Sequence, residues 1–459
     1  MPMPDPSRVP AEFPVALEPC YVTPVVNAPV TLYEGPVEFA TGDKTVSGHS
    51  ATVSLVWLPS PRIELHVVGF APIEAFVNNE EWTVRIPGRV GPLPLTWSRF
   101  STGAGPGVPP PKFTAILDRP DDPPPGQLRA VRFHVANGPK YLGEFVRNDD
   151  RTNMRRARAV MEAKPWRVTL EAVPPWHDGA DAQRLRGERG FAITHVGRLE
   201  HIDGSPFESA DAGPVLRAVG LMLSFCRGAW THPLLPVAEE ADTETPHHVW
   251  RVGHVDPAEP ELGWFPEFSN EGFDAFPGLF ARLDDAVWGE PIGNALHWYI
   301  VCNKPGPVSI EGAIVLQQAA FELLAWTLLV EDRRVLSEDG VQKLPASDRI
   351  RLMLSACDIP LAIPPGLAEL SRVAKDEKWQ DGPHATTEIR NAIVHASPKK
   401  RARILGHGFE VRTDAWTLGQ WYLELILLRL FDYNGPYSNR LRRGVGRGAE
   451  VEPVPWAKP

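Results

Sequence analysis

The segment Ser309–Asp332, SIEGAIVLQQAAFELLAWTLLVED, decides the fold class of the C-terminal third of the chain. It is long, strongly apolar and free of proline, and the hydroxyl of Ser309 suits the N-cap of a helix. Polar side chains interrupt it, so it lacks the roughly 20 predominantly apolar residues of a membrane span: Glu311, Gln317, Gln318 and Glu322. We therefore expect a buried core helix.

Further helices are predicted along the rest of this third. The segment 413–433, TDAWTLGQWYLELILLRLFDY, is a second long apolar helix, and its polar interruptions again argue against a membrane span. Shorter helices are predicted at 346–357 and 366–378. Such lengths and short connections indicate an antiparallel helical bundle.

Proline is the unusual component of the composition. The chain of 459 residues contains 49 prolines, about twice the usual share. Residues 1–150 hold 24 of them, and residues 308–430 hold six. Because proline breaks helix interiors, the first third cannot be a helical bundle. Short β-branched runs bounded by Gly, Pro and Asp predict strands instead: Thr45–Trp57, Arg62–Val68, Trp82–Ile86, Ala130–Val135 and Trp166–Val173.

The fold class that follows is multidomain α+β. We expect a β-rich, sandwich- or barrel-like N-terminal half followed by a C-terminal antiparallel α-helical bundle. The predicted units are a disordered Pro-rich tail at 1–15, a β-rich domain at 16–205, a mixed connector at 206–272 with a helix at 214–226 and short strands, the bundle at 273–440, and a basic, then Pro-containing tail at 441–459.

Charge and cysteine content narrow the class of protein. The net charge of −10 argues against non-specific DNA binding, which requires a basic surface. Residues 305–459 are nearly neutral, with 20 Lys and Arg against 19 Asp and Glu, which leaves room for a local basic site. The four cysteines are far apart and form no CxxC pair, so free thiols are expected. Without a signal-peptide pattern, we expect a cytoplasmic protein that does not contact a membrane.

Most catalytic and cofactor motifs are absent from the sequence. It contains no GxxxxGK[ST], HExxH, GxSxG or EF-hand pattern. His247, His248 and His254 in HHVWRVGH are metal-ligating residue types, but no carboxylate or thiol completes a ligand set nearby. Hydrogen-bonded histidines are the simpler interpretation, and we expect neither a cofactor nor a metal.

One cluster, residues 384–403 (HATTEIRNAIVHASPKKRAR), combines ionisable residues with helical spacing. Pro383 suits the first turn of a helix here, and Pro398 suits its end. Spacings of four, three and four place four polar residues on one stripe: His384, Glu388, Asn391 and His395. Basic residues follow directly: Lys399, Lys400, Arg401 and Arg403. Arginine braces phosphate oxygens and histidine moves protons near neutral pH, so the cluster suits a phosphodiester.

A structural interpretation fits the same cluster. A polar stripe is what a bundle helix presents to water. The helix dipole favours a charged histidine near a helix C-terminus without any catalysis. The basic run is then a solvated loop, and the pattern alone leaves both interpretations open.

The hexapeptide Arg390–His395, RNAIVH, resembles the R-polar-xxx-H motif of the HEPN superfamily. These small helical bundles include metal-independent ribonucleases of toxin and antiphage systems. The motif lies on a late helix between two long apolar helices, and the C-terminal pattern WYLELILLRLFDYNGPYSNRL also fits, so the resemblance covers about 290–440. The overall layout resembles the ApeA-like abortive-infection proteins.

The resemblance implies an endoribonuclease, a hydrolase that forms a homodimer with two motif helices facing each other. His395 would be the general acid/base on the ribose 2′-hydroxyl or the leaving 5′-oxygen, and Arg390 would stabilise the phosphorane-like transition state. Asn391 would orient His395 or a phosphate oxygen, and products would end in 2′,3′-cyclic phosphate. Spacing and charge, not the resemblance, add supporting and RNA-binding candidates: Glu388, His384, Lys399, Lys400, Arg401 and Arg403.

Two hypotheses about function result. In the first, a cytoplasmic HEPN endoribonuclease acts in antiviral defence, abortive infection or stress, and the N-terminal half senses an unknown trigger or ligand. In the second, the bundle is a non-catalytic dimerisation or nucleotide-binding module joined to a β-rich domain that binds protein or glycan.

Overall fold

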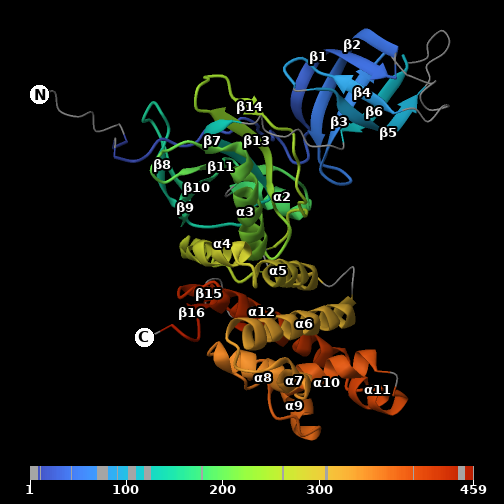
Figure 1. Ribbon diagram of the computed structural model, residues 1–459, viewed down its shortest axis with the longest axis vertical. Coiled ribbons are helices and arrows are strands. Elements are labelled where there is room, and N and C mark those ends of the chain that lie inside the picture. Colours follow the sequence, from blue (N-terminus) through green and yellow to red (C-terminus); the bar gives the residue numbers. More distant parts are fainter. Residues whose placement is uncertain are drawn as a thin grey trace, which may run out of the picture.

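The chain is an α+β protein with a β-rich N-terminal half and a helical C-terminal part (Figure 1), as the sequence predicts. The computed structural model describes residues 9–10, 12–42, 44–69, 81–89, 91–101, 110–117, 126–176, 179–260, 263–304, 309–395, 397–442 and 450–457. The side chains of five residues within these ranges lie outside the description: Trp97, Ser98, Lys400, Arg401 and Leu405. The Gly- and Pro-rich segments at 102–109 and 118–125 also lie outside the described residues.

The first part of the β-rich half is a closed barrel in the order β1-β2-β3-β6-β5-β4. Its strands are β1 Val30–Thr41, β2 Lys44–Val56, β3 Arg62–Val68, β4 Trp82–Arg85, β5 Leu93–Ser101 and β6 Lys112–Leu117. Alternate residues such as Phe39, Val53, Leu65 and Val84 fill its interior. Because β1 also pairs with β4, closure leaves no free strand edge.

A second sheet follows in the order β14-β13-β7-β11-β10-β9-β8, with β12 also paired to β7. Its strands are β7 Gln127–Ala136, β8 Glu144–Arg147, β9 Met154–Ala163, β10 Trp166–Ala172, β11 Ile193–His201, β12 Phe207–Glu208, β13 Pro233–Glu240 and β14 His247–His248. Helix α2, Gly179–Gly187, connects β10 to β11, and α3, Ala212–Arg227, connects β12 to β13. Since β13 pairs with the central strand β7, the expected connector at 206–272 instead completes this sheet.

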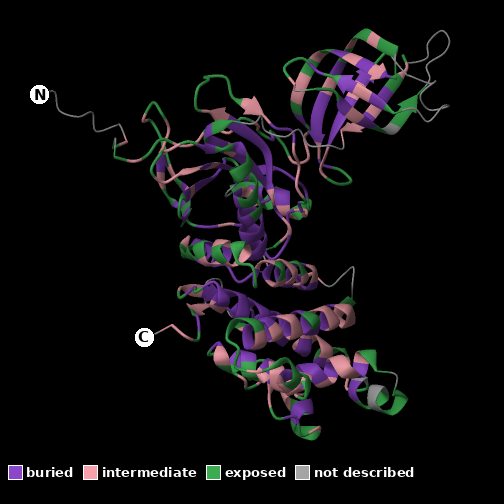
Figure 2. Cartoon of the chain, viewed as in Figure 1, coloured by how far each residue is buried: buried purple, intermediate pink, exposed green. Residues whose placement is uncertain are grey.

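The helical part contains α4 Phe276–Asp284, α5 Gly289–Asn303, α6 Ser309–Trp326, α7 Glu338–Gln342, α8 Ala346–Ala356, α9 Ala368–Asp376, α10 Gly382–Val394, α11 Pro398–Leu405 and α12 Phe409–Leu430. Its residues share one hydrophobic core with the second sheet (Figure 2). The hairpin of β15 Pro436–Ser438 and β16 Val451–Pro453 ends the described chain, beside α12.

The predicted long helix is confirmed. Ser309 Oγ accepts the Gly312 N–H at 3.2 Å, and α6 continues through a π-helical turn to Asp332. Ser309–Asp332 is long and apolar enough to cross a membrane by composition, yet 61% of its most apolar window is buried. Because α6 packs against α5, α8, α10 and α12, it is the core helix that the sequence predicts.

The N-terminal segment lies along the second sheet. We expect a disordered tail at 1–15, but Pro14 O accepts the Arg147 N–H at 3.0 Å, and Ala16 donates back to Arg147 O at 2.8 Å. Residues 1–8 and 11 lie outside the described residues. These bonds cover the edge strand β8, which would otherwise present unpaired backbone groups.

The same segment is fastened to the sheet by His134 of β7. Its Nε2 accepts the N–H groups of Cys20 and Tyr21 at 3.0 and 3.2 Å, and its Nδ1 lies 3.2 Å from Leu235 O. The acceptor role of Nε2 requires a neutral ring with the proton on Nδ1. Burial is the main cause that lowers the pKa of His134 to about 4.

A buried ion pair joins the end of α12 to the segment that follows it. Arg440 Nε donates to Glu424 Oε2 at 2.8 Å, and Arg440 Nη2 donates to Glu424 Oε1. Tyr299 donates to Glu424 at 2.8 Å, and Asn303 Oδ1 accepts from Arg440 at 2.9 Å. Burial alone would lower the pKa of Arg440, but the charge and hydrogen bonds of Glu424 outweigh burial, so the pKa of Arg440 is raised.

Acid weakens the native state through His134. The pKa of His134 falls from 6.5 to about 4 on folding, so between these pH values the imidazole is protonated in the unfolded chain and neutral in the folded chain. The contribution of neutral His134 to the free energy of unfolding is therefore complete above pH 6.5. It declines as the pH falls toward 4, by up to about 3 kcal/mol. We expect His134→Gln, which keeps an acceptor without titrating, to lose correspondingly less stability in urea unfolding between pH 6.5 and 4. Parallel stability curves would contradict this assignment.

Removing one partner of the buried pair leaves the other charge uncompensated. We expect Arg440→Met to lower the free energy of unfolding by about 3–5 kcal/mol. Arg442→Met is the matched control, because Arg442 pairs with Glu452 at 2.9 Å on the surface and 48% of its side chain is exposed. Its loss should stay within about 1 kcal/mol. Equal losses for both variants in chemical denaturation would show that burial of the pair is unimportant.

Candidate functional site

Helix α10 carries the RNAIVH motif, and its start is fixed by Asp381. The Asp381 carboxylate accepts the His384 N–H at 3.0 Å and pairs with Arg351 of α8 at 2.6 and 3.0 Å. Pro383 occupies the first turn, as predicted. Ala385 and Ile389 are buried, and α10 packs against α6, α8 and α12, so its outer face is held in a fixed orientation.

The polar residues of α10 form a hydrogen-bonded row. Arg390 Nη1 donates to Asn391 Oδ1 at 3.3 Å, and Asn391 Nδ2 donates to Glu388 Oε1 at 3.4 Å. All three side chains are half-buried. Within the described part of the chain, Arg390 forms no ion pair with a carboxylate, so its charge remains available to an anion.

His395 lies one residue past the end of this helix. The sequence predicts a helix that continues through His395, but α10 ends at Val394 and His395 has an extended backbone (φ −84°, ψ 140°). Its N–H still donates to Asn391 O at 3.0 Å, and its side chain is exposed. Because the helical backbone ends at Val394, the His395 ring does not extend the stripe by helical spacing.

The other predicted residues have different surroundings. His384 Nδ1 accepts the Gln380 N–H at 3.2 Å, which is a structural role at the start of α10. Pro398 begins the short helix α11 and does not close α10 directly, so the basic run lies on a helix. Arg403 pairs with Glu377 at 3.3 Å, and Lys399 is exposed. The side chains of Lys400 and Arg401 lie outside the described residues.

The histidines of HHVWRVGH do not converge. His248 Nδ1 lies 2.7 Å from Tyr21 Oη, and His254 Nε2 lies 3.5 Å from Asp256 Oδ1. No group of three or more metal-ligating side chains occurs among the described residues. None of the four cysteines forms a disulfide; Cys20 is exposed and the others are buried.

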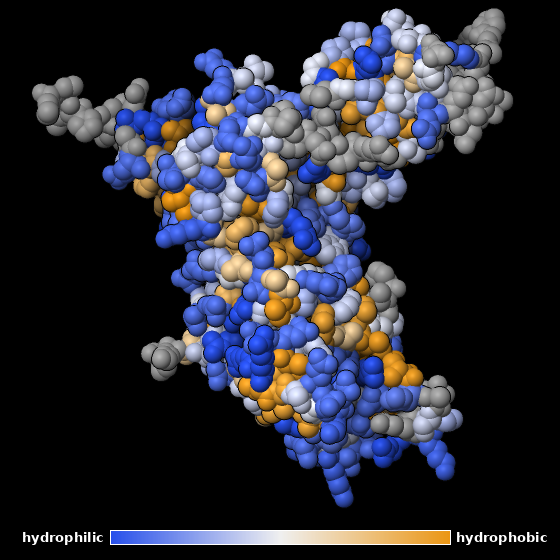
Figure 3. Space-filling model, viewed as in Figure 1, coloured by the Kyte–Doolittle hydropathy of each residue, from blue (hydrophilic) through white to orange (hydrophobic). Residues whose placement is uncertain are grey.

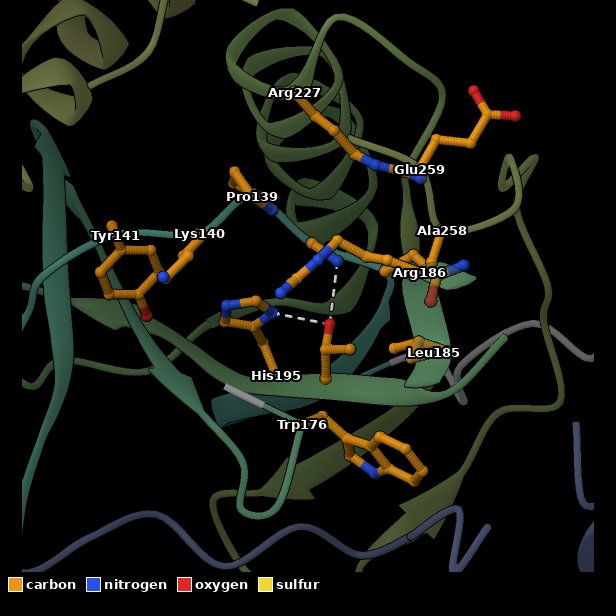
Figure 4. A pocket seen from close by; sticks show the side chains of 13 residues that line it. Pro139, Lys140, Tyr141, Trp176, Leu185, Arg186, His195, Arg227, Ala258 and Glu259 are labelled. Atoms are coloured by element: carbon orange, nitrogen blue, oxygen red, sulfur yellow. Dashed lines mark hydrogen bonds between the residues drawn. The ribbon is translucent and has the colours of Figure 1, made fainter. Parts of the chain in front are cut away.

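The structure reveals a pocket in the β-rich half that the sequence does not predict (Figure 4). Thr194 and His195 begin β11 at its floor, where His195 Nδ1 lies 2.9 Å from Thr194 Oγ1 and Gly138 N–H donates to the same oxygen at 2.8 Å. His195 stacks on Tyr141 with ring centroids 5.5 Å apart. The lining residues are dispersed between positions 137 and 259, and no local spacing marks them.

Two segments of the chain are similar to known protein families. The chain matches two family models. Residues 124–260 match the YopA central domain, and residues 285–451 match the YopA C-terminal domain. The first segment contains the strands of the second sheet, and the second segment runs from α5 to the β15–β16 hairpin; α4 and the barrel lie outside both.

A relative extends this similarity over the barrel. The SPbeta prophage-derived uncharacterized protein YopA of Bacillus subtilis (strain 168) is 26% identical over 457 residues. The alignment covers 96% of this chain and 98% of the relative, so the sequence similarity runs over nearly the full length of both and includes the residues of the barrel. No solved structure matches the chain.

We expect the N-cap of α10 to stabilise the native state. We expect Asp381→Ala to lower the free energy of unfolding by about 1–3 kcal/mol, because it removes both the N-cap and the pair with Arg351. Asp376→Ala is the control, since Asp376 forms an exposed pair with Arg372 at the end of α9. Its loss should remain below about 1 kcal/mol in urea unfolding. A larger loss for Asp376→Ala than for Asp381→Ala would contradict the role of the cap.

Proposed function

We propose that the chain is a metal-independent endoribonuclease of HEPN type that cleaves RNA to 2′,3′-cyclic phosphate ends. The observation that carries the proposal is the half-buried row of Arg390, Asn391 and Glu388, followed directly by the exposed His395. It combines an arginine that forms no ion pair among the described residues with an exposed histidine just past the end of a packed helix. The role in antiphage defence or stress is supported by the prophage origin stated in the name of the relative.

The chemistry follows from the residue types. His395 takes the proton of the ribose 2′-hydroxyl, whose oxygen attacks the adjacent phosphorus. The bond to the 5′-oxygen breaks, and this oxygen leaves as a hydroxyl after it takes a proton from an imidazolium or from water. Arg390 donates to the phosphate oxygens, on which negative charge increases in the transition state. Asn391 holds Arg390 in place through its side-chain oxygen. The β-rich half is the sensor or regulatory part in this proposal, in a cytoplasmic protein.

A homodimer through the helical part completes the proposed site. Figure 3 shows hydrophobic residues on the surface of the helical part. The exposed apolar side chains of the helical part include Val394, next to His395, and Phe409 at the start of α12. Two copies that meet around Val394 would cover this side chain and bring two His395 residues close together.

A non-catalytic module is the alternative, and one observation favours it. Arg390 Nε is enclosed and has no hydrogen-bond partner among the described residues, while Nη1 is bonded within the same helix. An arginine held in this way can serve packing alone. In that case the bundle is a dimerisation or nucleotide-binding unit joined to a β-rich part that binds protein or glycan.

The test is cleavage of several RNAs by the purified chain in EDTA. We expect wild type to cleave RNA, and His395→Ala and Arg390→Ala to lower the rate by about 10²-fold or more, because proton transfer and charge stabilisation are lost. Products should carry 2′,3′-cyclic phosphate ends, detectable by mass spectrometry.

His407→Ala is the matched control. His407 also follows a helix of this region, but its Nε2 pairs with Glu377 at 3.3 Å. It should retain the wild-type rate. If wild type cleaves none of the RNAs, or if all three variants behave like wild type, the catalytic proposal is wrong and the non-catalytic module is favoured.

A further inference from the structure

The second sheet has a pocket that lies outside the proposed nuclease site. It lies between the β7–β8 connection, the start of β11, α2 and the C-terminal end of α3. Its volume is about 50 Å³, room for a few water molecules or one tetrahedral anion. This space suits a small group such as phosphate, and the remainder of a larger ligand would lie outside it.

Three cationic side chains from three segments surround this space. Lys140, Arg186 and Arg227 line it, together with one carboxylate, Glu259. Glu259 is bound elsewhere, by Lys304 at 2.7 Å and by Arg189, and its carboxylate points away from the pocket centre in Figure 4. The space is therefore positive although the whole chain has a net charge of −10.

Arg186 differs from the other two cations in its partners. Arg227 is buried and donates to the carbonyl oxygens of Trp230, Asp256 and Pro257, and Lys140 Nζ lies 3.8 Å from Glu267. Half-buried Arg186, in the last turn of α2, has neither an ion pair nor a hydrogen bond among the described residues. Its guanidinium retains its donors for a ligand.

The floor of the pocket is polar and fixed. Thr194 and His195 are each 5% exposed. A Cβ atom at Gly138 would lie 2.5 Å from His195 Nδ1, so a side chain there would displace the ring. Thr194 Oγ1 donates to Val135 O at 3.3 Å and accepts the Gly138 N–H, so its hydrogen bonds fix the floor within the fold. Recognition of an anion is therefore left to the cationic side chains that line the space.

We propose that this pocket binds a phosphate group. A guanidinium recognises phosphate through two parallel hydrogen bonds, and Lys140 and Arg227 add positive charge. The group is either free inorganic phosphate or the terminal phosphate of a nucleotide or RNA whose remainder stays outside. The proposal is independent of the nuclease function, because no residue of α10 lines the pocket.

Titration calorimetry and thermal unfolding of the full chain test the proposal. The probes are inorganic phosphate, adenosine 5′-monophosphate, and one short RNA with either a 5′-phosphate or a 5′-hydroxyl, all against chloride at equal ionic strength. We expect phosphate-containing probes to bind and to raise the melting temperature. Arg186→Gln should weaken this binding about tenfold or more, and Arg186→Lys should weaken it less.

Arg184→Gln is the matched control, because Arg184 lies on the same helix and pairs with Glu188 at 2.6 Å on the exposed side. It should bind phosphate like wild type. Preference for inorganic phosphate or for the phosphorylated RNA identifies the source of the group, and either supports the proposal. The proposal is overturned if no phosphate probe binds. It is also overturned if Arg186→Gln, with the melting temperature of wild type in chloride, binds phosphate as tightly as wild type. RNA cleavage need not change in either variant.

Discussion

The buried ion pair of Glu424 and Arg440 is the constraint on which the rest of the structure depends. Both charges are almost fully removed from water, so each needs the other and the polar groups around them in fixed positions. Those groups come from α5, where Tyr299 and Asn303 complete the network. Asn303 also donates to Gly228 O at 2.8 Å, at the C-terminal end of α3. One network thus joins the helical part to the helix that packs on the second sheet.

Both candidate sites are positioned by helices that this network holds. Helix α12, which carries Glu424, packs against α10 and so supports the outer face with Arg390 and His395. Helix α3 ends with Arg227, whose guanidinium closes one side of the phosphate pocket. The second sheet and the helices, which match two separate family models, share one hydrophobic core. The barrel contacts this body through its own cluster, where Trp57 stacks on Phe191 at 5.9 Å.

Local patterns predict the elements well where the interactions are local. Ser309 caps α6, Pro383 lies in the first turn of α10, and Arg62–Val68 is a strand with the predicted bounds. The predicted structure of a segment is wrong where its conformation depends on residues far away in the sequence. The N-terminal residues before Ala16 pair with Arg147, more than 130 positions away, and no property of a Pro-rich segment indicates that partner.

By itself, the sequence determines the α+β class, the main helices and the motif from Arg390 to His395, because apolar periodicity, caps and proline positions act over a few residues. Only the tertiary structure decides that β13 completes the second sheet, that α10 stops before His395, and that Gly138, Arg186 and Arg227 meet in one pocket. The physical reason is the range of the interactions. Strand pairing and charge burial join segments that are far apart in the chain, and their partners are fixed only when the core forms.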